Sequence, residues 1–497
     1  MQHFKAAVFK LAFVMTAIIS SGLISLLTIG MLSALVHPGL HAQESHPANR
    51  DSATYHFTVV DTDGVPAPQR HGSANWKPAL LGTQINFITQ HLAPLTAPYA
   101  GTNSLTSHGD TQTSQAYGIY AGVQVNARLQ GYLDVEMLRG FGISHATGVA
   151  GISNGDVLRQ GSVDLGSGPY VARAYVRYTV PFTSATADTL AGAPDQLPTI
   201  VAARRLELFA GKLAVTDLFD LNRYANTTRW QFMNWALFQN SAWDFAADTR
   251  GYSNGVALVW IAPGYSFRAG SFQMPTLANG NHFDSDLRRA RGEQVELTVT
   301  APHTGTVVRI LGYLNHARMG SYRAALDLAS AARVAGNADS IPNIVANDQS
   351  GRSKYGFGLN LEQPLADSGE TGMFARLGWS DGANESFAFT EVDRHVSLGL
   401  QLSGVHWRRG NDRIGIAAVS HGIVRVHQEY LAAGGLGFLL GDGRLTYGPE
   451  QIFEAYYRTQ LGEFLQISPD LQLIRNPGYN RDRGTATVAS VRVNLRY

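Results

Sequence analysis

Arginine and carboxylate side chains of this 497-residue chain recur at every second position of segments whose other positions are apolar. Their guanidinium and carboxylate groups present many fixed hydrogen-bond donors and acceptors. A passage lined by both signs of charge can replace the hydration shell of a neutral polyhydroxyl solute without a charge barrier. For one residue alone, pairing across the wall of a fold is the simpler explanation; for the set, we predict a lumen lining. The set comprises Arg128, Asp134, Glu136, Arg173, Arg177, Arg268, Glu296, Glu362, Arg376, Glu454, Arg458 and Arg492.

Aromatic residues gather between residues 217 and 250, with polar side chains among them. Aromatic rings present flat apolar faces to the C–H faces of a sugar ring, and amide or charged groups bind its hydroxyls. Packing alone is the simpler role for most of these rings. We predict that the segment either packs against an inner wall or lines a constriction. The candidates for a constriction are Asp220, Asn222, Arg229, Trp230, Asn234 and Trp243.

The composition argues against several other chemistries. The chain has no cysteine, which excludes disulfides, thiolate metal sites and cysteine nucleophiles. With 39 Lys+Arg against 38 Asp+Glu, it lacks the basic excess of a nucleic-acid binder. Its 16 histidines are scattered, and His303, His316 and His395 fall in separate segments, so no catalytic set is evident. We therefore predict no enzymatic activity, no cofactor, no metal site and no nucleic-acid partner.

The elements that carry the charged side chains are predicted to be strands. From Ile119 to Met137 apolar and polar residues alternate almost without error, and successive side chains of a strand point to opposite faces. Val135 belongs to the apolar face, whereas Asp134 and Glu136 belong to the polar one. The segment is longer than the about 9–11 residues that cross a membrane. We therefore expect one strand that projects beyond the bilayer.

The same period returns along the rest of the chain and ends with Val491, Val493, Leu495 and Tyr497. A soluble antiparallel sandwich also alternates, but aromatic residues near the ends of the apolar faces favour a membrane barrel. After residue 42, no segment approaches about 18 uninterrupted apolar residues, which excludes helical spans. Lipid requires every backbone polar group to be paired, which leaves a closed barrel. We predict an all-β, transmembrane antiparallel β-barrel of about 16 strands with long extracellular loops.

The amino terminus is typical of an exported protein. Lys5 and Lys10 precede a long apolar stretch, which His37-Pro38-Gly39 ends just before Ala42. This pattern predicts a signal peptide over residues 1–42; the alternative is an uncleaved membrane anchor. Residues 43–82 are predicted to form a polar periplasmic lead-in, and residues 83–497 the barrel. The expected location is the cell outer membrane, with outer-membrane lipids around the wall.

Short and long connections alternate along the predicted barrel. Short links at 262–264 and 461–462 are typical of periplasmic turns. The alanine-rich stretch 322–335, followed by Gly336, predicts a short helix with a glycine stop in an external loop. The long connections are expected outside the cell and comprise 92–114, 140–168, 183–202, 214–251, 276–291, 315–353 and 421–448.

Short motifs also form a recognisable set. They are Asp217-Leu218-Phe219-Asp220-Leu221-Asn222, Gln231-Phe232-Met233-Asn234, Asp248-Thr249-Arg250-Gly251-Tyr252, Ser380-Asp381-Gly382-Ala383-Asn384-Glu385, Gly434-Gly435-Leu436-Gly437-Phe438-Leu439-Leu440-Gly441-Asp442-Gly443, Glu454-Ala455-Tyr456-Tyr457-Arg458 and Pro469-Asp470-Leu471-Gln472-Leu473-Ile474-Arg475-Asn476-Pro477-Gly478. Over roughly residues 115–497 this set resembles the carbohydrate-selective outer-membrane porins of the OprB family. The resemblance implies a 16-stranded barrel that passes glucose-like sugars by facilitated diffusion.

The sequence thus predicts a porin for facilitated, passive diffusion of small sugars through a polar, charge-balanced lumen. The nearest alternative is a general or anion-selective porin, although an anion-selective lining would need a surplus of one charge. A barrel enzyme of the outer membrane is a more distant alternative. The sequence leaves open whether the barrels form a homo-oligomer, such as a trimer, or remain monomeric.

Overall fold

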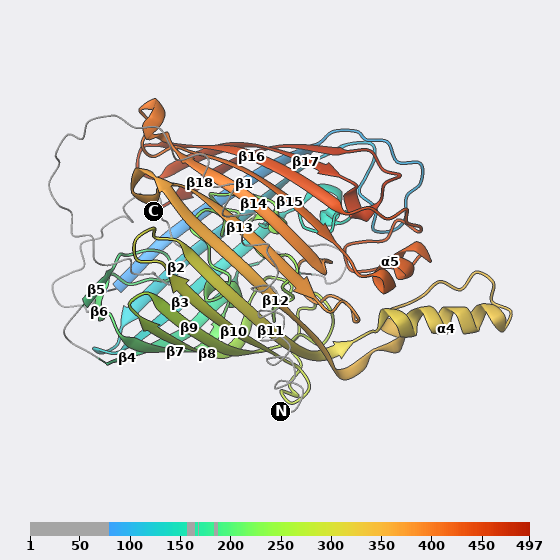
Figure 1. The fold of residues 1–497 in the computed structure, drawn as a ribbon, viewed down its shortest axis with the longest axis horizontal. Coiled ribbons are helices and arrows are strands. Elements are labelled where there is room, and N and C mark those ends of the chain that lie inside the picture. The colour runs from blue at the N-terminus through green and yellow to red at the C-terminus, as the bar shows by residue number, and fades with distance from the viewer. Residues whose placement is uncertain (1–78, 157–164, 167, 183–186) are drawn as a thin grey trace. The chain divides into compact units, whose positions relative to one another are not determined.

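Sixteen antiparallel strands close into one β-barrel (Figure 1). The computed structural model describes residues 79–156, 165–166, 168–182 and 187–497. Strands adjacent in the chain are neighbours in the wall, except that β4 pairs directly with β7. The barrel strands are β1 Ala79–Leu92, β2 Asp110–Gln124, β3 Leu129–Gly140, β4 Tyr170–Pro181, β7 Arg205–Leu213, β8 Ser253–Ala262, β9 Tyr265–Gln273, β10 Arg291–Thr300, β11 Val307–Met319, β12 Gln349–Ala366, β13 Thr371–Ser380, β14 Arg394–Ser403, β15 Arg413–Gly422, β16 Glu450–Leu461, β17 Leu465–Arg475 and β18 Ala486–Arg496.

The first and last strands close the barrel. β1 pairs antiparallel with β18, where Gln84 lies opposite Arg496. On its other side β1 pairs with β2, so no strand of this wall presents a free edge. An open edge in lipid leaves backbone groups unpaired, so closure allows the sheet to span a membrane. The prediction of about 16 strands is confirmed.

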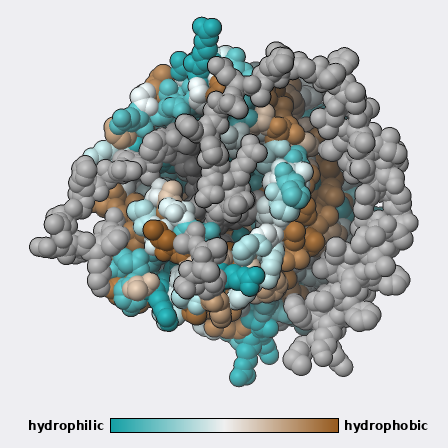
Figure 2. Space-filling model, turned by 60° about the vertical axis from the view of Figure 1, so that its left-hand side comes forward, coloured by the Kyte–Doolittle hydropathy of each residue, from teal (hydrophilic) through white to brown (hydrophobic). Residues whose placement is uncertain are grey.

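Side chains alternate across the wall as the sequence pattern predicts. On β3, Asp134 and Glu136 are buried on the inside, while Leu133 is 47% exposed on the outside. On β18, Arg492 is buried and Val491 is 48% exposed. In Figure 2, hydrophobic side chains form a band over part of the surface. An apolar outside and a polar inside are typical of a transmembrane barrel.

The segment 119–137, predicted to be one strand, is a hairpin. β2 ends at Gln124 and β3 begins at Leu129. In the turn between them, the Asn126 side chain accepts hydrogen bonds from the backbone N–H groups of Arg128, at 2.9 Å, and Leu129, at 3.0 Å. Such local bonding is what favours asparagine in turns. The apolar–polar alternation continues through the turn, so the periodicity alone does not reveal it.

Short turns and long loops lie at opposite ends of the barrel. In Figure 1, the carboxyl terminus lies at the turn end and helices α4 and α5 lie at the loop end. The connection 183–202 was predicted among the external loops, but its described residues, 187–202, lie at the turn end, because they come between β4 and β7 and antiparallel neighbours alternate in direction. It carries an extra hairpin, β5 Ala187–Leu190 and β6 Thr199–Ala202.

The helices lie in the connections. They are α3 Trp235–Phe238, α4 Tyr322–Val334 and α5 Arg425–Ala432. The predicted helix over 322–335 is confirmed as α4, and Gly336 follows it with φ 104°, the left-handed conformation of a glycine stop. No helix in the described part of the chain is long and apolar enough to cross a membrane. The 3₁₀ turns are Ile143–Ala146, Val215–Asp217, Val345–Asn347, Asp367–Gly369, Gly404–Trp407 and Pro477–Tyr479.

The amino-terminal predictions lie mostly outside the described residues. The signal peptide predicted over 1–42 falls outside them, and so does the lead-in predicted over 43–82 as far as residue 78. β1 begins at Ala79, which places the start of the barrel four residues before the predicted boundary at residue 83.

Candidate functional site

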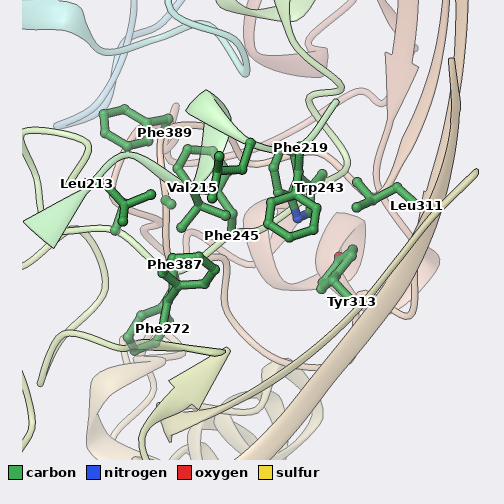
Figure 3. Packing of buried hydrophobic residues seen from close by; sticks show 14 of the residues in the cluster. Leu213, Val215, Phe219, Trp243, Phe245, Phe272, Leu311, Tyr313, Phe387 and Phe389 are labelled. Carbon is green, nitrogen blue, oxygen red and sulfur yellow. The ribbon is translucent and has the colours of Figure 1, made fainter. Parts of the chain in front are cut away.

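The connection between β7 and β8, residues 214–252, folds into the barrel. Nearly all of its side chains are buried, and Phe219, Trp243 and Phe245 form an aromatic cluster. Figure 3 shows this cluster near Phe272, which comes from β9 of the wall. This infolded loop fills part of the lumen and narrows it.

The wall beneath the infolded loop is apolar, which differs from the predicted polar lining. Ala257, Val259 and Ile261 of β8 are buried on the inner face. They belong to the same hydrophobic core as the aromatic cluster. Burying a valine or isoleucine side chain stabilises the folded protein by about 1.5–3 kcal/mol. Because the loop brings its own aromatic side chains inside, the strands that it covers carry apolar residues inward.

Charged residues elsewhere on the wall hold the infolded loop in place. Nε of Arg376 on β13 lies 3.1 Å from Oδ2 of Asp220, and the same guanidinium group donates to the Ala225 carbonyl at 2.7 Å. Glu296 of β10 accepts the backbone N–H of Asp220 at 2.7 Å and pairs with Arg268 of β9 at 3.0 Å. These residues were predicted to face the lumen and they project inward; Arg376 and Glu296 bind the loop, whereas Arg268 pairs with Glu296 on the wall.

Three further charged residues bind the backbone of the loop. Glu454 of β16 accepts the N–H of Asn234 at 3.0 Å. Arg458 on the same strand donates to the Trp230 carbonyl at 3.3 Å, and Arg492 of β18 donates to two loop carbonyls at 2.6 and 2.7 Å. Hydrogen bonds with a charged partner are roughly twice as strong as neutral ones. The loop is therefore tied to strands on several sides of the barrel.

The strand β12 adds another attachment. The side-chain amide of Asn222 donates to Asn360 at 2.7 Å. Glu362 lies two residues further along β12. It accepts the backbone N–H of Arg223 at 3.0 Å and pairs with Arg309 at 2.5 Å. Asn222 and Glu362 were predicted as a constriction residue and a lining residue, and both serve to attach the loop.

A cavity of about 170 Å³ remains between the infolded loop and the wall formed by β1 to β4. Arg229 of the loop projects into it. Its guanidinium group donates to Glu136 at 3.0 Å, to Asp156 at 3.2 Å and to the Tyr120 hydroxyl at 3.0 Å. Tyr252, at the end of the loop, also donates to Glu136, at 2.5 Å. The lining of the cavity thus includes a cation that is held by two carboxylates and one phenol.

Charges of both signs surround the cavity. Arg173 of β4 pairs with Asp217 at 2.7 Å and with Asp134 at 3.1 Å. Because acidic and basic groups are nearly balanced, the cavity lacks a strong electrostatic field of one sign, which would repel or trap ions. Among the described residues, no group of three or more histidine or acidic side chains could hold a metal ion. The charged residues that line the cavity are Glu136, Asp156, Asp195, Asp217, Arg173, Arg229 and Arg250.

Four buried donors of residues that line the cavity have no hydrogen-bond partner within the described residues. They are the indole N–H of Trp230, the side-chain NH₂ of Gln84, the hydroxyl of Thr249 and the Nε–H of Arg250. Buried polar groups in proteins are almost always paired. An aromatic ring beside polar groups suits a solute that carries hydroxyl groups on an apolar ring.

The predicted site residues divide into three groups. Arg128 is misplaced in the prediction: it lies exposed in the turn between β2 and β3, because the hairpin there was hidden by the alternation. Glu136, Arg173, Arg229 and Trp230 line the cavity. The remaining predicted residues face the inside but make ion pairs, hold the loop or pack in its core; they are Asp134, Arg177, Arg268, Glu296, Glu362, Arg376, Glu454, Arg458, Arg492, Asp220, Asn222, Asn234 and Trp243.

Several residues that line the cavity were not among the predicted site residues. Asp156 and Asp195 lie in connections without periodicity, so nothing in their surroundings indicates an inward position. Gln84 and Tyr120 lie on the inner faces of β1 and β2, and the alternation of those strands could have revealed them. Tyr252 is the last residue of the motif that begins at Asp248, and this motif could have identified Tyr252 as a site residue.

Comparisons with known proteins agree with this architecture. The model of the carbohydrate-selective porin, OprB family, matches residues 139–497. A sequence search of curated proteins finds no match.

The chain is also similar to solved structures. The chain is similar to Pseudomonas putida OprB in its high-pH structure, with 14% identity, a TM-score of 0.60, and coverage of 84% of this chain and 94% of that one. Salmonella typhi OmpF in complex with daunomycin gives 12% identity, a TM-score of 0.45 and coverage of 84% and 97%. The outer membrane channel DcaP of Acinetobacter baumannii gives 8% identity, a TM-score of 0.44 and coverage of 86% and 99%. At such low identity, the match to P. putida OprB shows a shared fold.

Proposed function

The chain belongs to the carbohydrate-selective porin (OprB) family, and from this premise we propose that glucose-like sugars diffuse through the cavity beside Arg229. The family and the barrel imply a channel rather than an enzyme. One observation supports this position most directly. Arg229 donates to both Glu136 and Asp156, and the Trp230 side chain lines the same cavity.

The geometry suggests how a sugar would pass. A sugar loses water when it enters a narrow lumen, and its hydroxyl groups then need replacement donors and acceptors. The guanidinium group of Arg229 can donate to hydroxyl oxygens, and the carboxylates of Glu136 and Asp156 can accept hydroxyl protons. The Trp230 ring offers an apolar face to the C–H groups. Because every contact is noncovalent and reversible, transport follows the concentration gradient.

Selectivity for neutral solutes would follow from the balance of charge. An anionic solute gains from Arg229 and Arg173 but faces the carboxylates around them, and a cation meets the reverse. A neutral polyhydroxyl solute uses both kinds of group. The alternative function is that of a general or anion-selective porin. In that case the charged groups of the lining would serve only as structural ion pairs and would not contact the solute.

The proposed location is the outer membrane, with lipids around the apolar wall and the turn end towards the periplasm. This orientation puts the long loops outside the cell, as is usual for outer-membrane barrels. Export would use residues 1–42 as a cleaved signal peptide. Sequencing the amino terminus of the protein purified from membranes is expected to start at Gln43. A protein that retains Met1 would instead carry an uncleaved anchor.

Liposome swelling tests the proposed function. Purified protein in liposomes should admit neutral sugars faster than amino acids and organic anions of similar size. Equal rates for all solutes of one size would identify a general porin, and faster entry of anions would identify an anion-selective one. No permeation of any solute would contradict channel function altogether.

A further inference from the structure

A strap at the turn end, residues 187–204, reaches back into the barrel. Its base is the β5–β6 hairpin, in which Leu190 lies opposite Thr199. The base is tied to the wall because Asp188 pairs with Arg205 of β7 at 2.9 Å. In Figure 1 the hairpin lies at the turn end of the barrel. The tip of the strap comprises residues 191–198.

The tip lies inside the lumen. The side chain of Gln196 accepts a hydrogen bond from Arg177 at 2.8 Å, and the backbone N–H of Leu197 donates to the Tyr132 hydroxyl at 3.2 Å. Arg177 and Tyr132 both project inward from the wall. Gln196 and Leu197 have no exposed surface. The strap therefore narrows the lumen from the end opposite the long loops.

The outermost turn of the tip presents Asp195 to the cavity. Ala193 and Gln196 exchange backbone hydrogen bonds at 3.1 and 3.0 Å, which makes Pro194 and Asp195 the central residues of a tight turn. Asp195 has φ 60°. Such a turn with a positive φ at its third position favours glycine. Besides glycine, aspartate and asparagine are the residues that best tolerate this conformation.

Other residues supply most of the attachment of the strap. The base is held by Asp188 and the tip by Gln196. Arg173 lies 3.6 Å from the Asp195 carboxylate but is already paired more closely with Asp217 and Asp134. Asp195 and Pro194 line the same cavity as Arg229 and Trp230. The Asp195 side chain is 14% exposed and lines this cavity beside Arg173 and Asp134.

We propose that the strap is a second selective narrowing of the pore and that Asp195 is its specificity-determining residue, which binds hydroxyl groups of a sugar on its way to the turn end. The inference rests on the proposed function, because it assigns a further contact to the same solute. In this arrangement, the sugar contacts the infolded loop on one side and the strap on another. The strap then limits the size of the saccharide that passes.

The variant Asp195→Gly tests the role of the side chain. Glycine adopts the positive φ without strain, so the turn is expected to persist. Loss of one hydrogen bond to a charged group typically weakens binding about tenfold. We expect glucose to block single-channel ion current with about tenfold weaker affinity in this variant. Asp339→Gly, at an exposed position of a long loop, is the matched control and should bind glucose as the unmodified protein does.

A shortened strap tests the narrowing. Residues 191–198 are replaced by Asn-Gly, which suits a two-residue hairpin turn between Leu190 and Thr199. Heat-modifiable mobility on gels checks that the barrel still assembles. We expect a larger ion conductance and a several-fold rise in the permeation of a trisaccharide relative to a monosaccharide. If assembly fails, Asp195→Gly decides the question alone.

The results separate the strap from the proposed function. Unchanged glucose affinity in Asp195→Gly would overturn the role of Asp195, and unchanged conductance in an assembled shortened variant would overturn the narrowing. If the unmodified protein shows no saturable binding of sugar, the proposed function fails. In that case a larger conductance of the shortened variant would still support the narrowing.

Discussion

Arg376 and Asp220 face each other in the barrel lumen with 3.1 Å between guanidinium and carboxylate, although 156 positions separate them in the sequence. Both side chains are buried. Asp220 belongs to the infolded loop and Arg376 to the wall strand β13, so this pair fixes how far the loop enters the barrel. The shape of the pore is therefore determined by buried ion pairs between loop and wall, and only a small part of the charged lining meets the open cavity.

Breaking this pair should loosen the loop while the barrel stays closed. Asp220→Asn leaves a buried guanidinium group without its countercharge, which costs on the order of 3 kcal/mol. Asparagine tolerates the positive φ of 55° at this position, so the backbone itself is not strained. We expect larger and noisier single-channel currents with normal heat-modifiable mobility. A quiet current of unchanged size would show that the pair does not position the loop.

Neutralising Arg229 should change the ion preference of the pore. Arg229→Gln removes a positive charge from a cavity that also contains Glu136 and Asp156. A unit charge about 4 Å away in a water-filled lumen contributes about 1 kcal/mol. We expect the cation-to-anion permeability ratio, measured from reversal potentials, to rise about fivefold. Arg288→Gln, at an exposed loop position, should leave the ratio unchanged; an equal shift in both variants would place Arg229 outside the ion path.

Two arginines on the predicted polar face should behave differently. Arg458 donates to the Trp230 carbonyl inside the barrel, and removing one charge-assisted bond weakens the attachment by about 1.5–3 kcal/mol. Arg458→Ala is therefore expected to alter conductance and weaken the block by glucose. Arg128→Ala, in the exposed turn, should alter neither property. Equal effects in planar-bilayer recordings would contradict the placement of Arg128.

The long loops contain buried groups that should respond to pH. His427 of α5 lies 3.4 Å from Glu391 and 3.7 Å from Asp393. Burial opposes protonation of this ring, but hydrogen bonds to Asp393 and Glu391 outweigh burial and raise the pKa of His427. Burial also raises the pKa of Glu385 to about 8. A histidine or a carboxyl group with a raised folded pKa stabilises the folded state at low pH and loses that contribution as pH rises.

Both groups therefore predict that the loop layer loosens as pH rises, and Glu385 has lost its contribution by about pH 8. Hydrogen-exchange protection factors of α5 amides, corrected for intrinsic rates, should fall as pH rises from about 5 to about 8. His427→Gln should reduce the pH dependence, because glutamine does not titrate there. Protection that stays constant across this range would show that neither group is linked to docking of α5.

The wall of the barrel could be predicted because its constraints are repeated. Each crossing must present apolar side chains to lipid and polar ones inward, so pairs such as Leu133 and Asp134 carry the same information again and again. The turn at Asn126 is an exception to this predictability. Apolar and polar residues alternate through the turn as they do in a strand, and only the hydrogen bonds of Asn126 distinguish the turn from a strand. A period of two gives the face of a residue but not the end of its strand.

The interior could be predicted only in part. Arg229 and Trp230 were identified because polar and aromatic residues are concentrated there, and both line the cavity. Arg376 was identified as inward, but its partner Asp220 depends on a fold of the loop that no local pattern encodes. Asp195 reaches the cavity through a strap whose path depends on long-range contacts with the wall. Such contacts arise only once the barrel is closed.

Titration of single-channel ion current with glucose tests whether sugar binds in the cavity beside Arg229 and Trp230. We expect a saturable decrease of current in the unmodified protein and a weaker block in Trp230→Ala, which loses the ring. The barrel of this variant should still conduct ions, because the ring lies in the loop and not in the wall. A current that falls only in proportion to solution viscosity, equally in both proteins, would show that glucose does not bind in this cavity.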